Sequence, residues 1–221
     1  TVNRYTWSRH RSTFLFSAES GSWVLKDGRL RQLCAAAGPA QPSNSQLSPA
    51  GDRVAYVLES SLYVEDLTSG QVVRLTHDVA SHLVNGSARG VYSGLNARGF
   101  RWSPDGEFIA YLQFDTQGVK EFTLVNYSDS LYSRTRSFPH VKPGETLPGC
   151  RAGIVSADGG ETIWLELSGD PRNHYLCYCD WTPDSRQLVV TQLNRRQNTA
   201  TVFLADRVSG QAQPILVDRD D

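Results

Sequence analysis

A short motif recurs four times along the 221-residue chain, and this repeat constrains the fold more than any other feature of the sequence. Three copies read SPAGDRVAY, SPDGEFIAY and TPDSRQLVV, and a degenerate copy reads SRHRSTFLF. The copies begin at Ser8, Ser48, Ser103 and Thr182. Three of them follow directly on a tryptophan: Trp7, Trp102 and Trp181. Sequence repeats at such spacings indicate that the chain is built from one recurring structural unit.

The clear copies have residues typical of a tight turn between two strands. In Ser-Pro-Asp-Gly, proline fixes φ, the aspartate side chain bonds to the local backbone, and glycine tolerates a positive φ. A run rich in β-branched and aromatic residues follows, as in 53–58, 107–114 and 187–192. A second strand–turn–strand segment completes the unit, as in 62–75. The pattern predicts four short antiparallel strands per unit and very little helix, because no 3.6-residue period is sustained.

Four-stranded units of about 40–50 residues are typical of β-propeller blades. The four copies are 40, 55 and 79 residues apart, and the longer intervals contain polar insertions at 78–101 and 127–151. We therefore predict an all-β chain of four blade-like repeats. The approximate blades are 1–40, 41–98, 99–172 and 173–221. A β-sandwich is the alternative for a run of short strands, but it gives no reason for the sequence to repeat.

Blades bury their faces on their neighbours, so four of them must close into a ring or have their ends covered. A four-bladed ring is rare, and half of an eight-bladed propeller is the other arrangement that the repeat allows.

Composition narrows the classes of function. The chain has 22 Lys and Arg against 23 Asp and Glu, a net charge of −1, whereas nucleic-acid and anionic-membrane surfaces need a basic excess. No apolar run approaches the ~18 residues that span a bilayer.

We expect no cofactor and no metal, because Gly-rich nucleotide motifs are absent and the spacing of His77 and His82 is not one used for metals. Four cysteines are too few for a disulfide scaffold. The compartment stays open, with a periplasmic or secreted location favoured.

The later repeats also resemble a known family. Residues 99–115 (GFRWSPDGEFIAYLQFD) and 173–198 are similar to the N-terminal β-propeller of dipeptidyl peptidase IV-type serine peptidases, of the prolyl oligopeptidase superfamily. Segments 121–126, 129–132 and 142–144 are similar to the bacterial members. The resemblance runs from about residue 85 to 217, and the first 78 residues are only propeller-like.

The resemblance implies an eight-bladed propeller followed by an α/β-hydrolase domain that carries Ser, Asp and His. It further implies that the propeller limits access to a cavity and contributes substrate contacts, while the enzyme releases N-terminal dipeptides, usually after Pro or Ala. The present chain departs from this pattern in its lack of a nucleophile elbow: no Gly is followed by Ser two residues on and Gly four residues on. No hydrolase domain and no catalytic residue is therefore assigned within these 221 residues.

A second departure concerns substrate binding. The family places two glutamates after a Val-Tyr pair in the insertion before the Trp-Ser-Pro-Asp-Gly motif, where their carboxylates would pair with the substrate's α-ammonium. Here the Val-Tyr pair is present at 91–92, but Ser93 and Gly94 stand where the acids should be, with Arg89 and Arg98 nearby. Two cations would repel an ammonium. The candidate substrate-binding residues are Arg89, Tyr92, Ser93 and Gly94.

Two hypotheses follow from the sequence. In the first, the chain is the non-catalytic propeller portion of a dipeptidyl peptidase IV-like serine peptidase, and its partners are a peptide substrate and either the hydrolase domain of the parent chain or a second copy of itself. In the second, it is a non-enzymatic propeller module that binds peptides or proteins.

Overall fold

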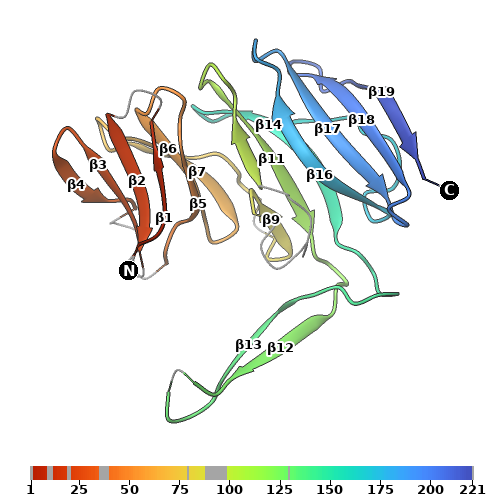
Figure 1. The fold of residues 1–221 in the computed structure, drawn as a ribbon, viewed down its shortest axis with the longest axis horizontal. Helices are drawn as coiled ribbons and strands as arrows, with labels where there is room; N and C mark the ends of the chain where they lie inside the picture. Colours follow the sequence, from red (N-terminus) through yellow and green to blue (C-terminus); the bar gives the residue numbers. More distant parts are fainter. Residues whose placement is uncertain are drawn as a thin grey trace.

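The computed structural model describes residues 2–8, 12–18, 21–34, 40–78, 80–87, 99–128 and 130–220. Every regular element in these ranges is a β-strand (Figure 1). The described ranges accordingly contain no helix long and apolar enough to cross a membrane. The prediction of an all-β chain is confirmed.

Three of the four blades are plain four-stranded antiparallel sheets whose strands lie in sequence order. The first consists of β1 (Val2–Trp7), β2 (Thr13–Ala18), β3 (Gly21–Lys26) and β4 (Arg29–Gln32). The second consists of β5 (Ser43–Leu47), β6 (Arg53–Leu58), β7 (Ser61–Asp66) and β8 (Val72–Arg74). The fourth consists of β16 (His174–Trp181), β17 (Gln187–Asn194), β18 (Thr199–Asp206) and β19 (Ala212–Arg219).

The third blade is more elaborate. Its sheet has the order β10 (Phe100–Trp102), β11 (Phe108–Asp115), β14 (Gly149–Ser156) and β15 (Ile163–Trp164). The short strand β9 (Leu83–Asn85) pairs with the last residues of β11, so this sheet begins ahead of residue 99. A hairpin of β12 (Glu121–Asn126) and β13 (Arg134–Pro139) is inserted between β11 and β14 and projects away from the blades (Figure 1).

The repeated motif forms the same turn in every blade. Its hydroxyl oxygen accepts the backbone N–H of the residue five positions on, at the start of the next strand. The pairs are Ser8 with Thr13, Ser48 with Arg53, Ser103 with Phe108, and Thr182 with Gln187. Asp105 and Asp184 accept further hydrogen bonds from this hydroxyl and from the N–H two residues on. These aspartates are turn residues, as the sequence predicts.

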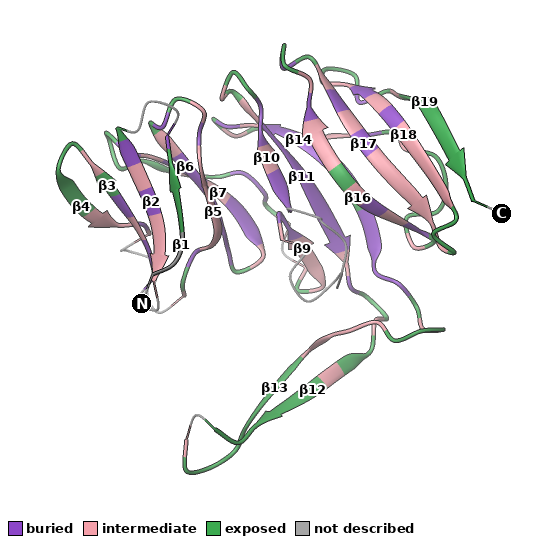
Figure 2. Ribbon diagram, viewed as in Figure 1, coloured by how far each residue is buried: buried purple, intermediate pink, exposed green. Residues whose placement is uncertain are grey.

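Hydrophobic clusters fill the three interfaces between successive blades. Figure 2 shows many buried residues on the strands of these blades. Each cluster draws on both of its blades. Leu15 and Tyr56 join the first two blades, Leu62 and Tyr111 the second and third, and Phe114 with Leu188 the third and fourth.

The tryptophans before the turns show that the row of blades is open at its first end. Trp7, Trp102 and Trp181 are the last residues of β1, β10 and β16 and have equivalent pairing. Trp102 and Trp181 are each 8% exposed, and their indole N–H groups donate to main-chain carbonyls of the preceding blade. Trp7 is 52% exposed. The two ends of the chain lie at opposite ends of the molecule (Figure 1), so the blades form an open arc rather than a closed four-bladed ring.

Candidate functional site

The candidate substrate-binding residues Arg89, Tyr92, Ser93 and Gly94 all lie outside the described residues. Their role stays a prediction. The structure does describe the residues on either side of 88–98 and a cavity beside them.

Two glycines on either side of the candidate residues are held at one point on β11. Leu112 donates its N–H to the carbonyl of Gly99 at 2.8 Å and accepts the N–H of Gly86 at 2.9 Å. Asn44, from the second blade, donates to the Gly86 carbonyl at 3.0 Å. A Cβ on Gly99 would lie 2.1 Å from that same carbonyl oxygen, and the φ of Gly99 is +54°. We call Asn44, Gly86, Gly99 and Leu112 the loop stem. It requires glycine at 99 and holds Gly86 and Gly99 against each other.

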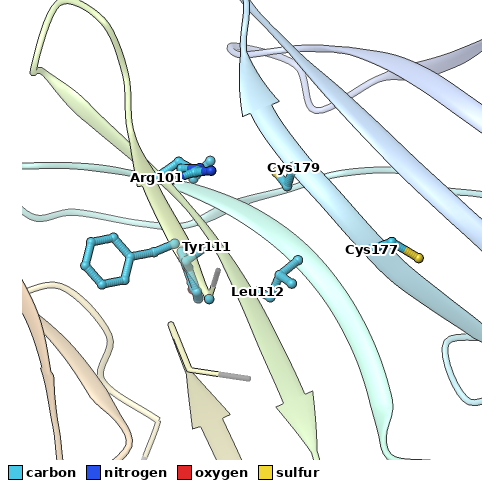
Figure 3. Close-up of a pocket in the computed structure, with 8 residues that line it drawn as sticks. Arg101, Tyr111, Leu112, Cys177 and Cys179 are labelled. Atoms are coloured by element: carbon cyan, nitrogen blue, oxygen red, sulfur yellow. The ribbon is translucent and has the colours of Figure 1, made fainter. Parts of the chain in front are cut away.

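A small cavity lies beside the loop stem, between the inner strands of the third and fourth blades. Arg101, Tyr111 and Leu112 border it from the third blade, and Cys177 and Cys179 border it from β16 (Figure 3). Its volume is about 20 Å³, which holds about one water molecule. The cavity is therefore too small for an amino-acid side chain.

Arg101 is the charged group at this cavity. Its side chain is partly exposed, and its Nε atom is buried without a hydrogen-bond partner among the described residues. Nε lies 3.8 Å from Oδ2 of Asp180. The same carboxylate accepts the Tyr178 hydroxyl at 3.2 Å, and its negative charge raises the pKa of Tyr178. The inner edges of the two blades are thus polar next to the loop stem.

The two thiols do not supply chemistry to this site. Burial and the nearby Asp180 carboxylate raise the pKa of Cys179 to about 12, and burial raises the pKa of Cys177. Both side chains are therefore protonated near neutral pH, whereas nucleophilic and metal-binding cysteines act as thiolates. The described ranges contain no group of three His, Cys, Asp or Glu residues that could hold a metal ion.

A larger cavity of about 500 Å³ lies among the repeated turns of the second and third blades. Asp52, Glu107 and Asp158 border it, together with Arg53, which pairs with Asp158 at 2.9 Å. Asp52 accepts a hydrogen bond from the Ser48 hydroxyl, so at least this acid has a structural role in the turn.

Sequence reasoning missed the residues that form the loop stem. Asn44 and Leu112 are separated from Gly86 and Gly99 by many residues, and only the packing of the second blade on the third brings them together. Gly99 is the one residue of the loop stem with a sequence signal, since it ends a polar insertion just before a strand.

Comparison with known proteins identifies the family. The family model for the dipeptidyl peptidase IV (DPP IV) N-terminal region matches residues 7–221. The chain belongs to this family. The DPP IV N-terminal region thus extends back over the first blades, where the sequence alone is only propeller-like.

Among curated proteins, the chain is 28% identical over 171 residues to dipeptidyl aminopeptidase B of Saccharomyces cerevisiae and 27% identical over 168 residues to the inactive dipeptidyl peptidase 10 of Mus musculus. These alignments cover 73% and 72% of the chain but only 21% of each relative. The chain therefore spans about a fifth of these DPP IV relatives.

A solved structure of the family has the same fold. The crystal structure of dipeptidyl peptidase 4 from Porphyromonas gingivalis matches all of the chain with a TM-score of 0.87 at 22% identity, and the match covers 33% of that protein. The prediction of β-propeller blades is confirmed.

Proposed function

We propose that this DPP IV N-terminal region is the non-catalytic propeller portion of a serine peptidase that releases N-terminal dipeptides. In this role it limits access to a catalytic site that the hydrolase domain of the parent protein supplies, and it contributes contacts to the peptide. The family match over residues 7–221 carries the proposal. The lack of a G-x-S-x-G motif agrees with a non-catalytic role for these residues.

The loop stem supports a role in substrate contact. It holds Gly86 and Gly99 at the inner edge of the third blade, beside Arg101 and Asp180. In a propeller the innermost strands face the central channel. The described loop stem, at this inner edge, is therefore on the side that a peptide in the channel would contact.

The test compares the 221-residue chain with its natural parent protein. Chromogenic Xaa-Pro and Xaa-Ala dipeptide substrates and a fluorophosphonate probe are applied to both. We expect dipeptide release and labelling of one serine in the parent, and neither in the isolated chain. A parent that binds peptides but neither hydrolyses the substrates nor reacts with the probe would contradict the proposal.

The contradicting result would support the alternative function, that of a non-enzymatic module that binds peptides or protein partners. One observation favours it: Ser93 and Gly94 replace the two acids that the family pattern places after the Val-Tyr pair, and Arg89 and Arg98 flank them. One of the curated relatives is also named inactive dipeptidyl peptidase 10. Binding of a peptide without turnover distinguishes this role from that of a peptidase.

A further inference from the structure

An arginine of the third blade is held in one fixed orientation without an ion-pair partner. Arg151, on β14, is exposed, and its guanidinium lies over the ring of Trp164 with 3.4 Å between Cζ and the ring centre. Its Nε donates to Oε1 of Gln113 at 2.8 Å. Stacking fixes the plane of the guanidinium, and the hydrogen bond fixes its rotation within that plane.

A buried polar network sets the direction of Gln113. This side chain is 2% exposed. Its Nε2 donates to Oδ2 of Asp78 at 2.9 Å and to Oδ1 of Asn85 at 2.8 Å. Because both of these atoms accept hydrogen bonds, the amide oxygen of Gln113 must face Arg151. Asn85, 1% exposed, also donates to Asp78 and to the Ser60 carbonyl. Each buried member is paired, as such a network requires to be stable.

The indole beneath Arg151 is fixed as well. A Cβ on Gly153 would lie 2.9 Å from the nearest atom of the Trp164 ring, so glycine makes room for it. Tyr111 packs against the indole with 5.7 Å between ring centres, and its hydroxyl hydrogen bonds with Thr162 at 2.9 Å. The ring on which the guanidinium rests is therefore part of the packed blade.

The remaining donors of Arg151 are its Nη1 and Nη2 groups. No described residue accepts a hydrogen bond from either, and no described carboxylate lies within ion-pair distance of them. Since Nε is already bonded to Gln113, the free edge of the guanidinium is the pair of Nη groups. Two parallel N–H donors on such an edge match the two oxygens of a carboxylate.

We propose that Arg151, oriented by Trp164 and Gln113, binds the carboxylate of a peptide. The group bound is a terminal carboxylate or an acidic side chain, which share this chemistry. A single negative charge suits the site better than a dianion, because the network contains one cation and one carboxylate, Arg151 and Asp78. The proposal uses none of the candidate residues at 89–94, and it does not depend on the proposed peptidase function.

The test is an NMR titration of the full chain that follows the Nε–Hε signal of Arg151. The first probes are N-acetylated trialanine as the free acid and as the C-terminal amide, so that no free N-terminus is present. We expect the acid to bind about fivefold more tightly than the amide, the size of a favourable surface ion pair. Amidated peptides with a central Glu or Gln then separate a side-chain carboxylate from a terminal one.

Matched variants test whether Arg151 causes the preference for the acid. Peptide binding to each variant is measured from the chemical shifts of backbone amides around Trp164, and a thermal melt checks that each variant is folded. Arg151→Gln should abolish the preference for the acid, whereas Arg136→Gln, which removes an exposed arginine of the hairpin, should leave it unchanged. Arg151→Lys keeps the charge but loses the paired donors, so it should lose most of the preference. Equal binding of acid and amide, or a full preference in either Arg151 variant, would overturn the proposal.

Discussion

His174 is a buried residue whose environment accepts only the neutral imidazole. Its Nε2 lies 3.1 Å from the Cys150 carbonyl and must donate to it. Its Nδ1 lies 2.9 Å from Nε2 of Gln192 and must accept from it. The Gln192 amide cannot turn round freely, because the same Nε2 also donates to the Ser168 carbonyl at 3.0 Å. Burial lowers the pKa of His174 below its ordinary value of 6.5.

This lowered pKa predicts a loss of stability in mild acid. The contribution of His174 is complete above pH 6.5, where the unfolded chain is also neutral, and is lost as the pH falls towards the lowered value. We expect the urea midpoint to fall between pH 7.5 and pH 5, and to fall less in His174→Asn. His140→Asn, on the hairpin side of the molecule, is the control. The pKa values of Asp66 and Asp206 are lowered from 3.8, so these two groups affect stability only in stronger acid. An unchanged pH dependence in His174→Asn would show that other groups cause it.

Ser93 and Gly94 allow a test of substrate register at the level of single residues. Introducing both acids, as Ser93→Glu with Gly94→Glu in the parent protein, should favour peptides with a free N-terminus over acetylated ones. A charge-assisted hydrogen bond is worth about 1.5–3 kcal/mol, so the preference in affinity should reach about tenfold. Competition binding with matched free and acetylated peptides measures it. Equal affinities would show that these positions do not face the substrate's N-terminus.

At the scale of elements, the loop stem makes a prediction about stability. Gly99→Ala would place a Cβ 2.1 Å from the Gly86 carbonyl oxygen in a backbone with positive φ, so we expect a loss of about 2–5 kcal/mol in the free energy of unfolding. Gly118 has a φ of +79° and open space around it. Gly118→Ala is therefore the matched control, with an expected loss of about 1–2 kcal/mol from backbone strain alone. Chemical denaturation compares the two. A similar loss in both variants would mean that the stem does not hold its close contact.

The recurring strand–turn–strand units could be predicted from sequence because each is local. Residues such as Ser103 and Asp105 satisfy the turn with bonds that span only a few positions. The pairing of β9 with β11 could not be predicted, because a three-residue strand in a polar insertion has no pattern of its own and depends on contacts made elsewhere. The hairpin β12–β13 was also missed as an element, since most of its residues are exposed on both faces and show no alternation.

The candidate site was less accessible to sequence reasoning than the fold. Family resemblance locates the altered residues 93 and 94, but Arg151 gives no signal in the sequence. Its importance arises from Gln113 and Trp164, which lie on separate strands and meet it only in the folded sheet.

At the scale of the whole molecule, both end blades have exposed apolar surface. Tyr5 and Trp7 are 66% and 52% exposed on the first blade, and Ile215 to Val217 on β19 are about half exposed on the last. Figure 2 shows β1 and β19 largely in the colour of exposed residues. Soluble monomers seldom expose large contiguous apolar patches, and the outer strands also leave edges free to pair. Such faces are the ones that further blades cover in a longer propeller.

Light scattering on the isolated 221-residue chain tests most directly the central claim, that these residues are an open half of a larger propeller. We predict self-association at tens of micromolar, with a two-fold dimer that completes a ring as the simplest product, and with smaller assemblies on dilution. A clean monomer at that concentration, with a single cooperative melt, would contradict the claim and would mean that four blades form a complete unit.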